Sequence, residues 1–333
     1  MNRILAALVV GIGLLLSAAA QAAEPYGIGL EGFAYPYPVS MLSLPDETEP
    51  LRLAYMDVRP VGQANGRAVL LLHGRNFPSS YWEPTIKALA AAGYRVVVPD
   101  QLGFGKSSKP LAPQSFDVLA RHTRALLDSL ALNRVDIVAH SMGGMLAVRF
   151  ARSYPERVDR LVLAAPIGLE DYRNFVPPVE TGRIMADEDK LTADGYRRQL
   201  VTNYSLTLPP GDITPFVEAR MRMKDAADYP RWLRAFVNSY QTIWGEPVVY
   251  EIPLLAQPVL FIMGANDHNA PGRAYAPEAV RAKMGDNARL AQDLAARMKQ
   301  ARVEVFEGIG HVVHLEAKER FNASVLSFLG GQR

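Results

Sequence analysis

Short apolar runs alternate with longer segments of helical periodicity from about residue 51 to the end of the chain. Runs of about five residues that are apolar at nearly every position are typical of strands buried on both faces of a parallel sheet. The pattern predicts strands at residues 51–58, 68–72, 95–99, 135–139, 160–165, 258–263 and 303–306. It predicts helices at residues 82–92, 116–130, 142–154 and 316–329. This alternation predicts an α/β fold, a mostly parallel sheet flanked by helices.

Two segments interrupt the alternation. About 90 residues separate the strand ending near residue 165 from the next strand, far more than a simple crossover needs. Residues 171–250 carry 11 of the 29 aromatic residues, so we expect an inserted helical cap whose aromatic side chains line a pocket or form the cap's own core. The core then comprises residues 23–170 and 251–333, with extra helical sequence at 270–302 and a Pro-, Gly- and Tyr-rich wrapping segment at 24–50.

The N-terminus has the pattern of a secretory signal peptide. Arg3 precedes an apolar stretch at residues 4–16, and the Ala20-Gln21-Ala22 sequence fits a cleavage site. This stretch of 13 residues is short for a membrane-spanning helix, which needs about 20. We therefore expect residues 1–22 to be a signal peptide whose cleavage leaves a periplasmic or secreted protein with no stable membrane insertion. The alternative is an uncleaved anchor.

Composition excludes several classes of function. Lys and Arg total 36 against 34 Asp and Glu in 333 residues, so no nucleic-acid partner is expected. The absence of cysteine excludes disulfides, thiolate zinc sites and a cysteine nucleophile. No metal and no organic cofactor is predicted.

Ser141 lies where an apolar strand stops and a helix begins, between the small residues Ala139 and Gly143. This arrangement matches a nucleophile elbow, G-x-S-x-G, a strained turn that exposes the serine hydroxyl. Small residues two positions before and after the serine are needed because larger side chains would collide with the turn. Ala139 replaces the usual first glycine and keeps this steric requirement.

A serine hydroxyl needs a base, and the base needs a partner that fixes its tautomer. Two later strands end in suitable residues: Asp267 follows the strand at 258–263, and His311 follows the strand at 303–306 in a glycine-flanked loop. The carboxyl ends of parallel strands share one edge of the sheet, so we expect Ser141, Asp267 and His311 to converge. His314 is the alternative base and Asp171 the alternative acid.

An acyl-transfer reaction also needs N–H donors for the oxyanion. The backbone N–H of Met142, directly after the serine at a helix start, is the first candidate. The second donor is expected from the loop at residues 73–77.

These motifs resemble those of the α/β-hydrolase superfamily over roughly residues 45–330. The resemblance rests on Leu-Leu-His-Gly at 71–74, the segment 99–108, Ala-His-Ser-Met-Gly-Gly at 139–144, Gly-Ala-Asn-Asp at 264–267 and Gly-Ile-Gly-His at 308–311. It implies Ser141 as nucleophile, Asp267 as acid, His311 as base, and the N–H groups of Arg75 and Met142 as the oxyanion hole. It also implies that Asp100 is structural.

The resemblance implies acyl chemistry, because the epoxide hydrolases and haloalkane dehalogenases of this fold use aspartate at the position of Ser141. We predict a serine hydrolase that acts on carboxylic esters of small to medium molecules, its partner being a small-molecule acyl substrate. Amide, lactone or carbon–carbon bond hydrolysis with the same triad is the alternative. The segment Gly74-Arg75-Asn76-Phe77-Pro78 replaces the glycine-rich loop of the carbon–carbon hydrolases and weakens that option. A non-catalytic ligand-binding protein of this fold is the remaining alternative.

Overall fold

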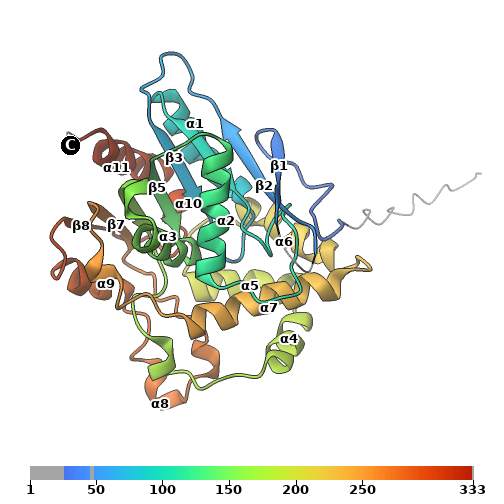
Figure 1. Ribbon diagram of the computed structural model, residues 1–333. Helices are drawn as coiled ribbons and strands as arrows, with labels where there is room; N and C mark the ends of the chain where they lie inside the picture. Colours follow the sequence, from blue (N-terminus) through green and yellow to red (C-terminus); the bar gives the residue numbers. More distant parts are fainter. Residues whose placement is uncertain (1–25, 46–48, 332–333) are drawn as a thin grey trace, which may run out of the picture.

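The computed structural model describes residues 26–45 and 49–331, so the predicted signal peptide at 1–22 lies outside the described residues. Within that part of the chain an eight-stranded sheet has the order β1-β2-β4-β3-β5-β6-β7-β8 (Figure 1). Strands β3 to β8 run parallel to one another, whereas β2 is antiparallel to both β1 and β4. The strands are β1 Val39–Leu44, β2 Leu51–Val58, β3 Ala68–Leu72, β4 Arg95–Pro99, β5 Val135–His140, β6 Val158–Ala164, β7 Val259–Gly264 and β8 Ala301–Phe306.

Helices cover both faces of the sheet. The buried strand residues therefore alternate between two apolar clusters, one on each face. Leu70 and Leu72 pack on one face with helices α2, α3 and α9, while Val69 and Leu71 pack on the other with α1 and α11. These helices are α1 Glu83–Ala91, α2 Phe116–Ser129, α3 Met142–Ser153, α9 Asn287–Ala295 and α11 Lys318–Gly330. The α/β fold predicted from the sequence is confirmed.

The long segment between β6 and β7 is helical, as its length predicted. It forms α4 Thr181–Asp189, α5 Ala193–Tyr204, α6 Pro210–Lys224 and α7 Tyr229–Gly245. In Figure 1 helices α4, α5 and α7 lie at the end of the molecule opposite α1. Tyr204 of this segment contacts the loops after β3 and β8: its hydroxyl accepts from the Asn76 amide, and its backbone carbonyl accepts from the His311 N–H. We call residues 171–250 the cap segment; its limits as a domain stay a prediction.

Two expectations about secondary structure need correction. Residues 24–50 were expected to wrap over the core, and Tyr26 and Tyr35 do contact α6 and Asp100, but residues 39–44 form the edge strand β1. The helix expected at 316–329 is α11, but it begins at Lys318 because Ala317 has a non-helical conformation (φ −132°, ψ 48°), and a short helix, α10 Val313–Glu316, precedes it. The short α8 Glu278–Arg281 and α9 occupy the segment with extra helical sequence.

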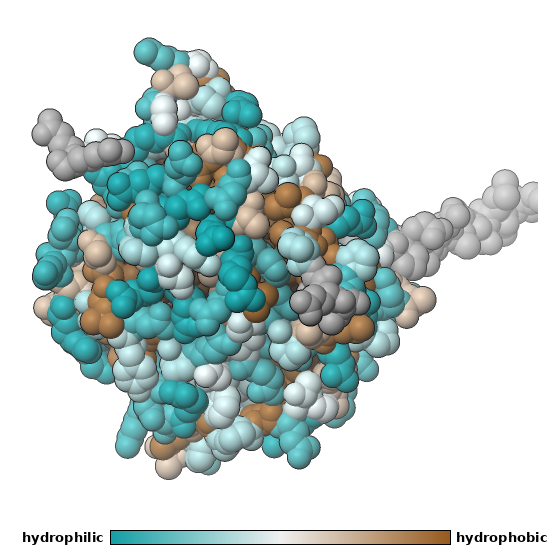
Figure 2. Space-filling model, in the orientation of Figure 1, coloured by the Kyte–Doolittle hydropathy of each residue, from teal (hydrophilic) through white to brown (hydrophobic). Residues whose placement is uncertain are grey.

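The surface seen in Figure 2 is mostly hydrophilic, with hydrophobic residues scattered in small groups. Among the helices of the described residues, none combines the length and the apolar character that a membrane span requires.

Candidate active site

Ser141 joins β5 to α3 in a backbone conformation that side chains rarely adopt, with φ 56° and ψ −121°. Such a conformation costs about 1–3 kcal/mol and persists because neighbouring contacts hold it. The Ser141 N–H donates to the Ala164 carbonyl (3.2 Å), and its carbonyl accepts from the Gly144 N–H (2.9 Å). A Cβ at Gly143 would lie 2.4 Å from the Leu72 carbonyl oxygen, so the glycine is required by this close approach. The elbow geometry predicted from small flanking residues is present.

The three side chains singled out in the sequence meet at this turn. His311 Nε2 lies 2.9 Å from Ser141 Oγ, and His311 Nδ1 lies 3.0 Å from Asp267 Oδ2. All three residues are buried, with exposed fractions of 4% or less. A carboxylate can only accept a hydrogen bond, so the neutral imidazole carries its proton on Nδ1 and presents a lone pair to the serine hydroxyl. The arrangement can remove a proton from Ser141.

The backbone of His311 is fixed on both sides. Its N–H donates to the Tyr204 carbonyl of the cap segment (2.8 Å), and its carbonyl accepts from His140 Nε2 (2.9 Å). The rings of Tyr204 and His311 also pack together, with centroids 4.6 Å apart. The predicted base is therefore held by contacts from the cap segment and from the residue that precedes Ser141.

A buried chain of hydrogen bonds links His311 to the loop after β3. The Gly74 N–H donates to the Tyr81 hydroxyl (2.8 Å). The hydroxyl donates in turn to His140 Nδ1 (3.0 Å), because His140 Nε2 faces a carbonyl and must carry the proton of the neutral ring. Burial raises the pKa of Tyr81 well above its usual value, which keeps the phenol protonated. Burial also lowers the pKa of His140 well below its usual value, so its ring stays neutral and donates from Nε2 to His311. The loop that supplies a predicted oxyanion donor and the loop that supplies the predicted base are thus connected.

The alternative base and acid lie apart from Ser141. The His314 ring stacks on Trp82 with centroids 4.2 Å apart, and neither of its ring nitrogens has a partner among the described residues. Asp171 binds Arg173 through its side chain (2.7 Å) and accepts from the Tyr250 hydroxyl (3.0 Å). Hydrogen bonds from Arg173 hold the pKa of Asp171 below its usual range. Both residues have a structural environment instead of a contact with the serine.

The two predicted oxyanion donors belong to segments that border Ser141. Met142 begins α3, and Arg75 follows Gly74 in the loop after β3. Within residues 26–45 and 49–331 neither backbone N–H group has a hydrogen-bond acceptor, whereas the Gly74 N–H is already bound to Tyr81. Both Arg75 and Met142 therefore keep a backbone donor for a ligand oxygen.

The Arg75 side chain ties its loop to the cap segment. Its guanidinium donates to Ser239 Oγ (3.0 Å) and to the Phe236 carbonyl (3.2 Å), and lies 3.7 Å from the Phe236 ring centroid. Glu188 of α4 lies 3.6 Å from Arg75 and 2.5 Å from Arg220. Burial alone would raise the pKa of Glu188, but the two arginines outweigh burial and hold it below its usual value. A charged group in the cap segment thus positions the loop that carries a predicted oxyanion donor.

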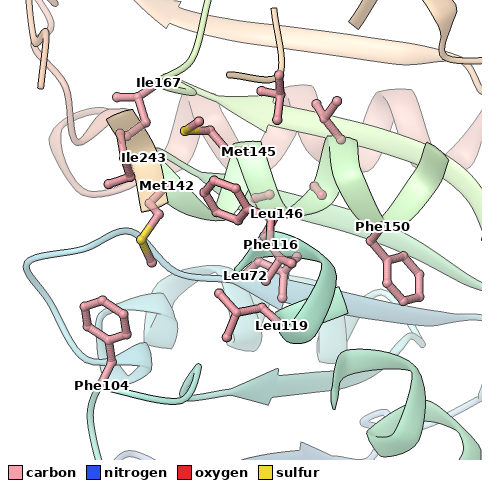
Figure 3. Packing of buried hydrophobic residues seen from close by; sticks show 14 of the residues in the cluster. Leu72, Phe104, Phe116, Leu119, Met142, Met145, Leu146, Phe150, Ile167 and Ile243 are labelled. Atoms are coloured by element: carbon pink, nitrogen blue, oxygen red, sulfur yellow. The ribbon is translucent and has the colours of Figure 1, made fainter. Parts of the chain in front are cut away.

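Ser141 opens into a large pocket between the core and the cap segment, with about 1430 Å³ of empty space, part of it continuous with solvent. Three arginines line this pocket together with Glu188: Arg75, Arg273 and Arg281. A smaller apolar cavity of about 350 Å³ lies beside Met142. Figure 3 shows Met142 at one end of the buried cluster, near Phe104, which also lines this cavity, and away from Phe150.

Sequence reasoning missed three residues that contact the site. Tyr81 and Tyr204 reach it from a short helical turn and from the end of α5, and no local motif marked either residue. Asn269, whose amide lies 3.2 Å from His311 Nε2, is only two residues beyond Asp267. Its closeness to the predicted acid was the one sequence signal that could have drawn attention to it.

Comparison with known proteins relates these features to one fold. The model of the alpha/beta hydrolase fold matches residues 67–318. A 2-hydroxy-6-oxononadienedioate/2-hydroxy-6-oxononatrienedioate hydrolase of Burkholderia vietnamiensis is 33% identical over 85% of this chain and 92% of its own. The crystal structure of a probable hydrolytic enzyme from Pseudomonas aeruginosa is 41% identical, with a TM-score of 0.88 over 93% of this chain and 99% of its own. An esterase from Exiguobacterium antarcticum (18% identical, TM-score 0.67, covering 88% and 99%) shares the fold.

Proposed function

The chain belongs to the α/β-hydrolase family, and we propose that it is a serine hydrolase that cleaves carboxylic esters through an acyl-enzyme. The observation that carries this proposal is the unbroken series of contacts from Asp267 through His311 to Ser141, at 3.0 and 2.9 Å, at the edge of a large pocket.

In the proposed reaction His311 Nε2 takes the proton of Ser141 as Oγ attacks the ester carbonyl. Asp267 keeps the opposite ring nitrogen protonated and stabilises the imidazolium that forms. The N–H groups of Arg75 and Met142 bind the oxyanion, each worth roughly 10²- to 10³-fold in turnover. His311 then gives its proton to the departing alcohol, and water releases the acid from Ser141.

The test is replacement of the nucleophile. Ser141→Ala should keep the fold, lose at least ~10³-fold in turnover of a p-nitrophenyl ester, and no longer react with a fluorophosphonate probe. Ser129→Ala, at an exposed position of α2, is the matched control and should keep both properties. Equal turnover in wild type and Ser141→Ala would reject the mechanism.

A second candidate is hydrolysis of a carbon–carbon bond next to a ketone in an anionic substrate. The Burkholderia vietnamiensis relative is named for a dienedioate, a dicarboxylate, and is similar to this chain over most of its length. The pocket offers Arg273 and Arg281, whose guanidinium groups donate only to backbone carbonyls among the described residues. Cationic groups in a pocket wall favour a substrate that carries carboxylates.

A substrate panel separates the two candidates. Neutral p-nitrophenyl esters, a lactone, an amide and a 2-hydroxy-6-oxo-dienedioate should be compared by kcat/KM on one preparation. The ester proposal requires the neutral esters to be turned over at least ~10-fold more efficiently than the dienedioate. The reverse order would replace it with the second candidate.

We also propose that the protein is exported with cleavage after Ala22, on the basis of the N-terminal sequence. Expression in a Gram-negative host followed by osmotic release and intact-mass measurement tests this proposal. The released protein should begin at Ala23. A full-length product that stays with the membrane fraction would instead identify residues 1–22 as an anchor.

A further inference from the structure

Asn269 is held in place next to the triad by its own backbone. Its N–H donates to Asp267 Oδ1 (3.0 Å), the carboxylate oxygen that does not face His311. Its carbonyl accepts from Asn287 Nδ2 (3.0 Å), and Asn287 is 98% buried at the start of α9. The backbone of Asn269 is therefore fixed by Asp267 on one side and by a buried amide on the other, and its side chain extends from this fixed point.

The Asn269 amide faces the ring nitrogen that exchanges protons. Among the residues that the structure describes, His311 Nε2 has two neighbours within hydrogen-bond distance, Ser141 Oγ at 2.9 Å and the Asn269 amide at 3.2 Å. The neutral ring offers one lone pair there, because its proton is on Nδ1 beside Asp267. Asn269 also lines the large pocket, so its amide lies between the base and the space open to ligands.

The two neighbours of Nε2 differ in what happens to them during the reaction. Once Ser141 carries an acyl group it has no hydroxyl proton, and the Asn269 amide is then the remaining polar neighbour of Nε2. A primary amide has a carbonyl acceptor as well as two N–H donors, and rotation of the side chain by half a turn exchanges them. Asn269 can therefore accept one hydrogen of a water molecule whose other hydrogen points at Nε2.

We propose that Asn269 is a catalytic residue of the second half-reaction, in which it binds the hydrolytic water beside His311; this inference rests on the proposed function. The water gives one proton to Nε2 while its oxygen bonds to the acyl carbon. Collapse of the resulting oxyanion breaks the bond to Ser141 Oγ, which regains the proton from Nε2, and the carboxylic acid leaves. The first half-reaction has no water to position and does not need Asn269.

The experiment compares Asn269→Leu, which fills the space without hydrogen bonding, with Asn269→Ser, which keeps a hydroxyl. Asn266→Leu, at an exposed position of the same turn, is the matched control. Fluorophosphonate labelling of Ser141 measures nucleophile activation, and p-nitrophenyl acetate turnover with intact-mass detection measures release of the acyl group. Circular dichroism checks that each variant is folded.

Asn269→Leu should label within ~3-fold of the wild-type rate, lose at least ~10-fold in kcat, and accumulate protein heavier by one acetyl group. Asn269→Ser should recover part of kcat, and Asn266→Leu should match wild type. Labelling and turnover that fall together, or a kcat that does not change, would overturn the role of Asn269 while leaving the serine mechanism intact. Failure of wild-type Ser141 to label or to form any acetyl-enzyme would overturn both proposals.

Discussion

His311 and His314 lie three residues apart, and both are fully buried, yet their surroundings are opposite. His311 has a partner at each ring nitrogen, Asp267 and Ser141. His314 has none among the described residues and instead stacks on Trp82. Burial therefore does not distinguish a histidine that is proposed to transfer protons from one that fills the core. The contacts of its two nitrogens do.

The local backbone of each histidine explains the difference: a glycine loop precedes His311, and helix α10 carries His314. A Cβ at Gly310 would lie 2.3 and 2.4 Å from the carbonyl oxygens of Ser205 and Tyr204, so the absence of a side chain lets this loop approach the end of α5. That approach allows the His311 N–H to bind Tyr204 and directs the ring towards the serine. His314 follows in α10, whose direction places its ring against Trp82, on the sheet face covered by α1 and α11.

The largest effect should come from replacing each of the two histidines separately. His311→Gln removes the base and should lower ester turnover at least ~10³-fold, with a matching loss of fluorophosphonate labelling. His314→Phe keeps a flat ring against Trp82 and should keep turnover within ~3-fold of wild type. Steady-state kinetics on both variants measures this. A deep loss in folded His314→Phe, with activity retained in His311→Gln, would make His314 the base.

The next effect tests the close approach of the loop. Gly310→Ala forces a methyl group against two backbone oxygens, and we expect about 2–4 kcal/mol lower free energy of unfolding, measured by urea denaturation. Gly308→Ala is the matched comparison: its Cβ would meet nothing within 4 Å, but φ is +75°, so we expect about 1–2 kcal/mol. Turnover should fall in folded Gly310→Ala more than in Gly308→Ala. Equal losses of stability would show that contact with residues 204 and 205 is not what requires Gly310.

The sequence predicted those features of the site that are set by where each strand ends. Apolar runs located β3, β4, β5 and β7 to within about one residue, and small residues around Ser141 and His311 marked the tight turns. Edge strand β1 was missed because half of its residues are exposed, so it lacks a continuous apolar run. Tyr204 and Tyr81 were missed for another reason. They reach the site through the packing of segments distant in sequence, which no local period records.

The smallest effect concerns pH, because burial and the nearby His311 push the pKa of His314 well below its usual value. The unfolded chain binds a proton at this position below about pH 6.5, and the folded chain does not. The free energy of unfolding should therefore fall as the pH drops below about 6.5, by up to about 2 kcal/mol at pH 5 from this group.

His314→Phe removes that contribution and should flatten the acid side of the stability profile relative to wild type. His140 shares the same environment and keeps its own acid sensitivity in both proteins, so the slope should decrease without vanishing. Urea denaturation from pH 5 to pH 8 measures the slope, and an offset from imperfect packing of Phe cancels because only the pH dependence is compared. Parallel profiles for the two proteins would mean that the His314 ring binds a proton in the folded state. A ring without hydrogen-bond partners could do so only if water or a partner reached it, which would remove the contrast with His311.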